Sequence, residues 1–224
     1  MIKENLFKVL DSIKKGNNLG EPITLVGASK TMSVEVINEA ISSGLKVVAE
    51  NKVQEFREKH SLLLPYAEQH FIGHLQTNKV KYLVGNVSLI HSVDSVKLAQ
   101  EINKEANKKG VVQKILIEVN IGSELSKSGF SFEETASAVG EISKLDSVEI
   151  KGLMAMLPIS SDSDYLASLC KKMRSLYDDL KNDGYPFEYL SMGTSGDYNI
   201  AINNGSNTIR LGRNIFGERN YGGK

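Results

Sequence analysis

Residues 23–30, with the sequence ITLVGASK, form an apolar run that ends in a lysine. Seven further apolar runs follow along the chain, and most of them are continuous rather than alternating. They occupy residues 45–51, 70–76, 88–94, 114–121, 148–157, 187–193 and 208–217. Continuous runs of this length are typical of strands that are buried on both faces of a parallel sheet. The sequence therefore predicts eight parallel strands, the first of which ends near Lys30.

Segments with helical periodicity lie between these runs, and one further helix is predicted before the first strand. Its apolar positions are Ile2, Leu6, Val9, Leu10 and Ile13. Eight strand–helix alternations in about 200 residues favour a (β/α)8 barrel, with an open doubly wound sheet as the alternative. We expect an α/β fold in which residues 1–224 form a single domain.

The composition excludes several classes of protein. Lys and Arg total 27 and so do Asp and Glu, which gives no basic excess for nucleic acid or an anionic membrane. The single cysteine, Cys170, excludes an internal disulfide and a multi-cysteine metal site, and its predicted helix favours a packed structural thiol. No apolar run reaches the length of a membrane span, and the N-terminus does not resemble a signal peptide. We expect a soluble, cytoplasmic protein.

Polar residues gather where the predicted strands end, which is the active-site face of a (β/α)8 barrel. They are Lys30, Glu50, Asn51, His74, Gln76, His91, Ser92, Asp94, Glu118, Asn120, Ser191 and Arg210. Lys30 follows an apolar strand, so partial desolvation would suit it to Schiff-base chemistry. The alternative is a lysine ion-paired with Glu50 or Glu118.

Residues 191–197, SMGTSGD, predict a phosphate cradle. Two glycines allow close approach of the backbone, hydroxyl groups donate hydrogen bonds, and a short helix is predicted from Asp197. Arg210 and Gly212 on the next strand favour this interpretation over a simple glycine-rich turn. An imine-forming lysine opposite a phosphate site suits either pyridoxal 5′-phosphate or a sugar phosphate handled by a Schiff-base aldolase.

The histidines carry weaker signals. His74 could act in acid–base chemistry, although a hydrogen-bonding scaffold is the commoner role for such a residue. We expect His60 and His70 to lie at the surface of a helix and a loop. The four histidines are dispersed and lack metal-binding spacing, so we expect no catalytic metal.

Seven motifs along the chain resemble those of the pyridoxal phosphate homeostasis proteins, single-domain relatives of the alanine racemase N-terminal barrel. The motifs are VGASK (26–30), AENKVQE (49–55), HFIGHLQTNK (70–79), VNIGSELSKSG (119–129), GLMAM (152–156), LSMGTSGD (190–197) and IRLGRNIFGERNY (209–221). The resemblance implies that Lys30 holds pyridoxal phosphate as a Schiff base and that Arg210 faces the pyridine nitrogen. The cofactor-binding set that it implies is Lys30, Asn51, His74, Met154, Ser191, Met192, Gly193, Thr194, Arg210, Gly212 and Arg213.

Two positions in these motifs need separate comment. Arg213 stands where relatives often carry a serine or threonine, so it either replaces a hydroxyl contact to phosphate with a charged one or points outward. Lys127 matches a lysine that the family resemblance implies could accept or relay cofactor at a second site.

The resemblance implies storage, shielding and delivery of pyridoxal phosphate, with little or no catalysis. A protonated arginine leaves the pyridine nitrogen unprotonated, which weakens the cofactor as an electron sink. Alanine racemase overcomes this with two opposed bases, one of them from a second domain that we do not expect here. An amino-acid racemase-type enzyme remains the alternative. We expect a monomer, with pyridoxal phosphate-dependent apoenzymes as the recipients of the cofactor.

Overall fold

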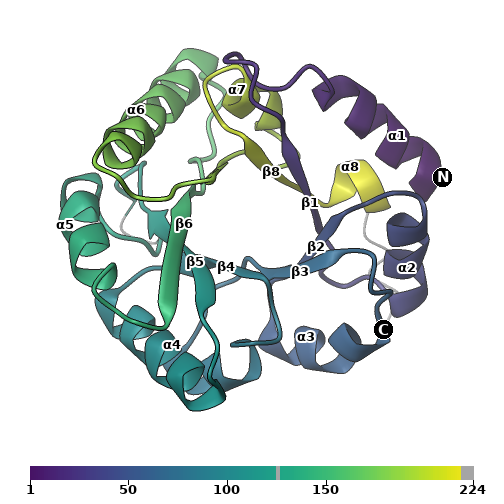
Figure 1. Cartoon of the computed structure of the whole chain (residues 1–224). Coiled ribbons are helices and arrows are strands. Elements are labelled where there is room, and N and C mark those ends of the chain that lie inside the picture. The colour runs from purple at the N-terminus through teal and green to yellow at the C-terminus, as the bar shows by residue number, and fades with distance from the viewer. Residues whose placement is uncertain (125–126, 218–224) are drawn as a thin grey trace.

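The strands close into a complete barrel in sequence order (Figure 1). The computed structural model describes residues 1–124 and 127–217. Each strand pairs in parallel with the next, and β1 pairs with β8 to complete the sheet. The strands are β1 (Thr24–Ala28), β2 (Val47–Glu50), β3 (Glu68–Phe71), β4 (Leu89–Val93), β5 (Gln113–Val119), β6 (Val148–Ala155), β7 (Tyr189–Ser191) and β8 (Thr208–Leu211). The predicted (β/α)8 barrel is confirmed, and the open doubly wound sheet is wrong.

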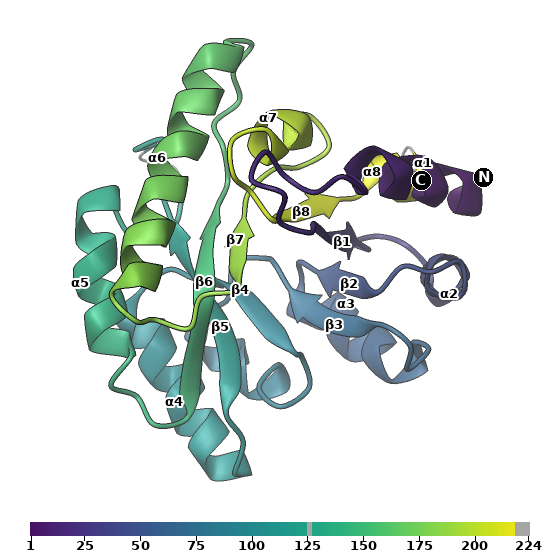
Figure 2. The same ribbon diagram turned by 45° about the horizontal axis from the view of Figure 1, so that its top comes forward.

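Helices alternate with the strands and cover the outside of the barrel (Figures 1 and 2). The α-helices are α1 (Ile2–Ile13), α2 (Val34–Ser42), α3 (Val53–Lys59), α4 (Val96–Lys109), α5 (Phe132–Ile142), α6 (Ser163–Asn182), α7 (Tyr198–Ile202) and α8 (Arg213–Phe216). Two 3-10 helices, η1 (His60–Leu62) and η2 (Thr77–Tyr82), follow α3 and β3. Among the described residues, no helix is long and apolar enough to cross a membrane.

Two strands end several residues before the apolar runs that predict them. β3 ends at Phe71 although the run continues to residue 76, because the chain turns away over the loop after β2. A Cβ atom on Gly73 would lie 1.9 Å from the backbone oxygen of Asn51, so only glycine permits this crossing. β8 ends at Leu211, where Gly212 begins the short helix α8.

The predicted N-terminal helix completes the outer layer. α8 has only four residues, and α1 packs beside it, so α1 covers the part of the barrel that a long eighth helix would cover (Figures 1 and 2). Leu6 of α1 is fully buried in a cluster with Ile37, Ile209 and Ile215.

Cys170 lies on α6 and is buried, as predicted for a packed structural thiol. Burial raises the pKa of this thiol to about 12.

Leu6→Ala should destabilise the protein by about 2–4 kcal/mol, because it opens a cavity between α1 and the barrel. The neighbouring Phe7→Ala is the matched control, since Phe7 is 50% exposed, and it should cost less than about 1 kcal/mol. Urea unfolding of both variants measures the difference. Equal losses would show that α1 is not part of the core.

Candidate functional site

A cavity of about 440 Å³ opens at the carboxyl ends of the strands. Its volume suits a small organic ligand. Eight members of the cofactor-binding set implied by the resemblance line it, namely Lys30, Asn51, His74, Met154, Thr194, Arg210, Gly212 and Arg213. His74 and Arg213 are exposed, so the cavity is open to solvent at these walls. Barrel closure therefore gathers most of the predicted set around one space.

The remaining members of the predicted set lie elsewhere. Ser191 and Met192 are fully buried beneath the cavity, and Gly193 packs against α7. Lys127 lines a separate cavity of about 260 Å³, which shares Glu118 as a wall with the first. Its amine donates a hydrogen bond to the backbone oxygen of Leu157 at 3.1 Å and forms an ion pair with Glu124.

The loop that carries Lys30 is held on both sides. The Ser29 hydroxyl donates to Glu50 at 2.8 Å, and the Thr31 backbone N–H donates to Glu55 at 2.7 Å. Lys59 lies between the two carboxylates, at 3.1 Å from Glu50 and 2.8 Å from Glu55. Thr31 adopts a left-handed conformation with φ of 67°, which is uncommon for a residue with a side chain. These contacts fix the direction in which the chain leaves β1.

Glu50 is almost fully buried in this network. Burial raises its pKa, and the charge of Lys59 together with the Ser29 hydroxyl acts in the opposite direction. The sequence left Glu50 open as a partner for Lys30, and the structure pairs it with Lys59.

The glycine-rich stretch forms a tight turn at the cavity wall. Gly193 has φ of 97°, and a Cβ atom there would lie 2.8 Å from the Cα atom of Tyr198. The backbone N–H and hydroxyl of Thr194 both donate to Asp197, at 2.5 and 3.1 Å. Within residues 1–124 and 127–217, the backbone N–H groups of Ser195 and Gly196 have no hydrogen-bond acceptor. Two such donors in a turn suit an anion.

Arg210 lines the cavity and is only 4% exposed. Its guanidinium donates to the backbone oxygens of Ser191 at 2.9 Å and Ala155 at 3.0 Å, and it contacts the Met156 sulfur at 3.0 Å. Burial lowers the pKa of Arg210 to about 10, although the negative charge of Glu118 opposes the shift. The side chain therefore stays charged at neutral pH and acts only as a donor.

Glu118 is a titratable group in the cavity wall whose behaviour the sequence did not reveal. Burial raises its pKa to about 7, and the nearby charge of Asp94 adds to the shift while Arg210 and His74 oppose it. The apolar run around Glu118 is the only sequence signal for such burial. In the lining of the same cavity, Asn51 has a buried side-chain oxygen with no hydrogen-bond partner among the described residues.

The prediction that His70 lies at the surface is wrong. His70 is 2% exposed, on β3 inside the barrel, where its ring contacts His91 of β4. His60 is half-buried and stacks on Phe56, with ring centroids 4.7 Å apart. His74 is exposed and lies 3.3 Å from Asp94, which fits the scaffold role. The buried position of His70 depends on pairing with other strands, which its own segment does not encode.

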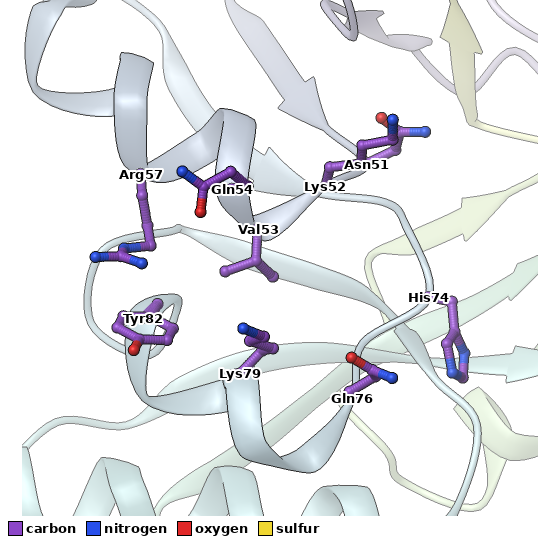
Figure 3. A pocket seen from close by; sticks show the side chains of 9 residues that line it. All are labelled: Asn51, Lys52, Val53, Gln54, Arg57, His74, Gln76, Lys79 and Tyr82. Atoms are coloured by element: carbon purple, nitrogen blue, oxygen red, sulfur yellow. The ribbon is translucent and has the colours of Figure 1, made fainter.

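A further cavity of about 320 Å³ lies beside the first, between α3 and η2 (Figure 3). Three cationic side chains line it, those of Lys52, Arg57 and Lys79, and its described lining residues include no carboxylate. The Arg57 guanidinium stands 4.3 Å from the centroid of the Tyr82 ring. Cationic side chains next to the mouth attract anionic ligands toward it.

Comparison with known proteins identifies the family. The family model described as alanine racemase, N-terminal domain, matches residues 26–220. A protein of Aquifex aeolicus called pyridoxal phosphate homeostasis protein is 43% identical over 97% of this chain and 98% of its own length. The Homo sapiens protein of the same name is 36% identical over 89% of this chain and 78% of its own length. The chain belongs to the pyridoxal phosphate homeostasis protein family.

Solved structures agree with membership of the pyridoxal phosphate homeostasis family. PipY of Synechococcus elongatus with PLP bound is 28% identical, with a TM-score of 0.85 over 97% of this chain and all of that one. The form of PipY without PLP gives a TM-score of 0.88 at 29% identity, with the same coverage. Alanine racemase of Clostridium difficile shares the fold at 18% identity and a TM-score of 0.80, over 98% of this chain and 58% of that enzyme.

Lys59→Met should destabilise this family member by about 3 kcal/mol at pH 7, because it leaves Glu50 buried without its cation. The loss should shrink as the pH falls and Glu50 takes up a proton. Lys14→Met, which removes an exposed ion pair with Asp11, is the control and should not change stability measurably. Urea unfolding at pH 7 and pH 5 measures both. An unchanged Lys59→Met protein would contradict the bracing role of the network.

Glu118→Gln should stabilise the protein at pH 8 by about 1–2 kcal/mol. This value is smaller than the free energy that corresponds to the whole pKa shift, because Glu118 is partly exposed. The raised pKa means that the folded state favours the protonated carboxyl. The Glu118 carboxyl therefore adds to stability at pH values below the pKa that it has in the unfolded chain. This contribution is lost as the pH rises toward 7, the pKa in the folded protein. Unfolding at pH 5 and pH 8, without added ligand, should show the variant's advantage only at pH 8. An equal advantage at both pH values would refute the raised pKa.

Proposed function

We propose that this protein binds pyridoxal 5′-phosphate, with Lys30 as its covalent anchor, and stores, shields and delivers the cofactor with little or no catalysis. The observation that carries the proposal is one cavity lined by Lys30 from β1, Arg210 from β8 and the turn at residues 194–196. The names of the relatives and the PLP bound to PipY support it.

The residues of the cavity fit this cofactor group by group. Pyridoxal phosphate supplies an aldehyde that reacts with a primary amine, a pyridine nitrogen that accepts a hydrogen bond and an anionic phosphate. Lys30 offers the amine, and Arg210 offers a charged donor. The N–H groups of Ser195 and Gly196, which have no acceptor within the described part of the chain, offer donors for the phosphate together with the exposed Arg213. The side-chain oxygen of Asn51, without a partner in that same part, is a further polar group in the wall.

Arg210 also limits what the site does chemically. A guanidinium that stays protonated donates to a pyridine nitrogen and leaves that nitrogen without a proton. A ring in this state withdraws electrons weakly, which disfavours transformations of amino acids that need a stabilised carbanion. Arg210 therefore favours retention of the cofactor over its use in catalysis.

The open walls suit delivery of the cofactor. His74 and Arg213 are exposed at the cavity, so an incoming amine can reach Lys30 from solvent. We extend the proposal to a monomer acting in the cytoplasm, with pyridoxal phosphate-dependent apoenzymes as recipients. The electrically balanced composition fits small-molecule and protein partners rather than nucleic acid.

Lys30→Ala should abolish the visible absorbance of the loaded protein and leave its unfolding temperature without cofactor unchanged. Lys127→Ala is the matched control, since it removes a lysine from the neighbouring cavity, and it should retain the absorbance. Absorbance titration with pyridoxal phosphate and thermal unfolding measure both properties. Undiminished absorbance of the Lys30→Ala protein would refute the proposed anchor.

The racemase-type alternative predicts exchange of the α-proton of an added amino acid. Incubation of the loaded protein with L-alanine in deuterated water, followed by NMR, should show no exchange beyond that of free pyridoxal phosphate. Sustained enzymatic exchange would establish catalysis in place of storage.

A further inference from the structure

A chain of hydrogen bonds crosses the barrel interior from its base to Arg210. Glu68 at the base lies 3.3 Å from Nε2 of His70, and Nδ1 of His70 lies 3.0 Å from Nε2 of His91. Nδ1 of His91 lies 3.3 Å from the Ser191 hydroxyl, which also accepts a hydrogen bond from Arg210. Glu68 is largely exposed, and the other four side chains are buried.

The acceptor at the base of this chain, together with neutral rings, fixes the direction of its bonds. The Glu68 carboxylate has acceptors only, so His70 donates to it from Nε2. A neutral His70 then accepts at Nδ1 from the Nε2–H of His91, and a neutral His91 accepts at Nδ1 from the Ser191 hydroxyl. The Ser191 oxygen keeps a lone pair for Arg210, which has donors only. One consistent direction therefore runs from the cavity to the base of the barrel.

This direction requires both imidazoles to be neutral, and burial favours that state. Burial lowers the pKa of His70, although Glu68 opposes the shift. Burial also lowers the pKa of His91 well below its ordinary value, and the positive charge of Arg210 acts in the same direction. With the proton of His91 on Nε2, a proton on Nδ1 of His70 would place two N–H groups against each other between the rings.

The chain does not carry protons to the cavity, because Arg210 has no acceptor atom and stays protonated. The chain instead holds the Ser191 hydroxyl in one orientation. While the Ser191 hydroxyl donates to His91, its oxygen faces Arg210 as an acceptor, and the guanidinium keeps two bonds to the same residue.

We propose that His91 and His70 are positioning residues that hold Ser191 and Arg210 in one hydrogen-bonded arrangement beneath the cavity. This proposal rests on the proposed function in one respect, namely that pyridoxal phosphate is the ligand that Arg210 contacts. The polarity of the chain is a property of the protein without cofactor and is tested separately.

The first test is long-range ¹H–¹⁵N NMR of the imidazoles in the protein without cofactor. At pH 7, His70 and His91 should both be neutral with the proton on Nε2. A cationic ring, or a proton on Nδ1 of either residue, would overturn the proposed polarity. This outcome does not depend on whether pyridoxal phosphate binds.

The second test compares His91→Phe with His60→Phe, which changes a histidine outside the chain. His91→Phe should weaken pyridoxal phosphate binding about tenfold, as expected for about 1.4 kcal/mol, and should shift the absorbance maximum of the bound cofactor. His60→Phe should change neither. Wild-type affinity and an unshifted spectrum in folded His91→Phe protein would overturn the positioning role.

A surface variant keeps the test available if His91→Phe fails to fold. Glu68→Lys replaces the acceptor at the base with a donor and should move the proton of His70 to Nδ1, whereas Glu68→Gln keeps an acceptor and should preserve the tautomer. Glu141→Lys is the control for the change of charge at another exposed carboxylate. Unchanged tautomers in Glu68→Lys would overturn the proposal.

Discussion

The pairing of β1 with β8 is the constraint on which the site depends. Its register sets Val26 opposite Arg210 and Gly27 opposite Leu211, so the strand that leads to Lys30 lies beside the strand that carries Arg210. Closure leaves the sheet without an edge and gathers the ends of all the strands around one space. Residues from opposite ends of the chain meet there because the ring is complete.

The charged side chains buried in this barrel need polar partners around them. A buried guanidinium costs free energy unless donors are matched by acceptors and its charge is balanced. Two backbone oxygens and the Ser191 hydroxyl supply the acceptors that Arg210 needs. The Lys59 ion pairs do the same for Glu50 beneath the Lys30 loop. The site is therefore held by matched polar groups on a rigid barrel.

The sequence predicts what depends on local pattern. Continuous apolar runs predicted all eight strands, and their polar ends predicted Lys30, Asn51 and Arg210 at one cavity. Properties that depend on contacts between strands could not be predicted from the sequence. His70 was misplaced because its partners lie on other parts of the sheet, and the raised pKa of Glu118 depends on burial and on Asp94. The contacts of the Ser191 hydroxyl with His91 and Arg210 likewise come from other strands.

The most direct measurement is reductive trapping of the loaded protein. Borohydride fixes pyridoxal phosphate to the amine that holds it, and peptide mass mapping then locates the modified residue. If the cavity at the barrel mouth is the cofactor site, a stoichiometric label should appear on Lys30 and not on Lys127. A label confined to Lys127 or to other lysines, with Lys30 unmodified, would contradict the assignment of this cavity.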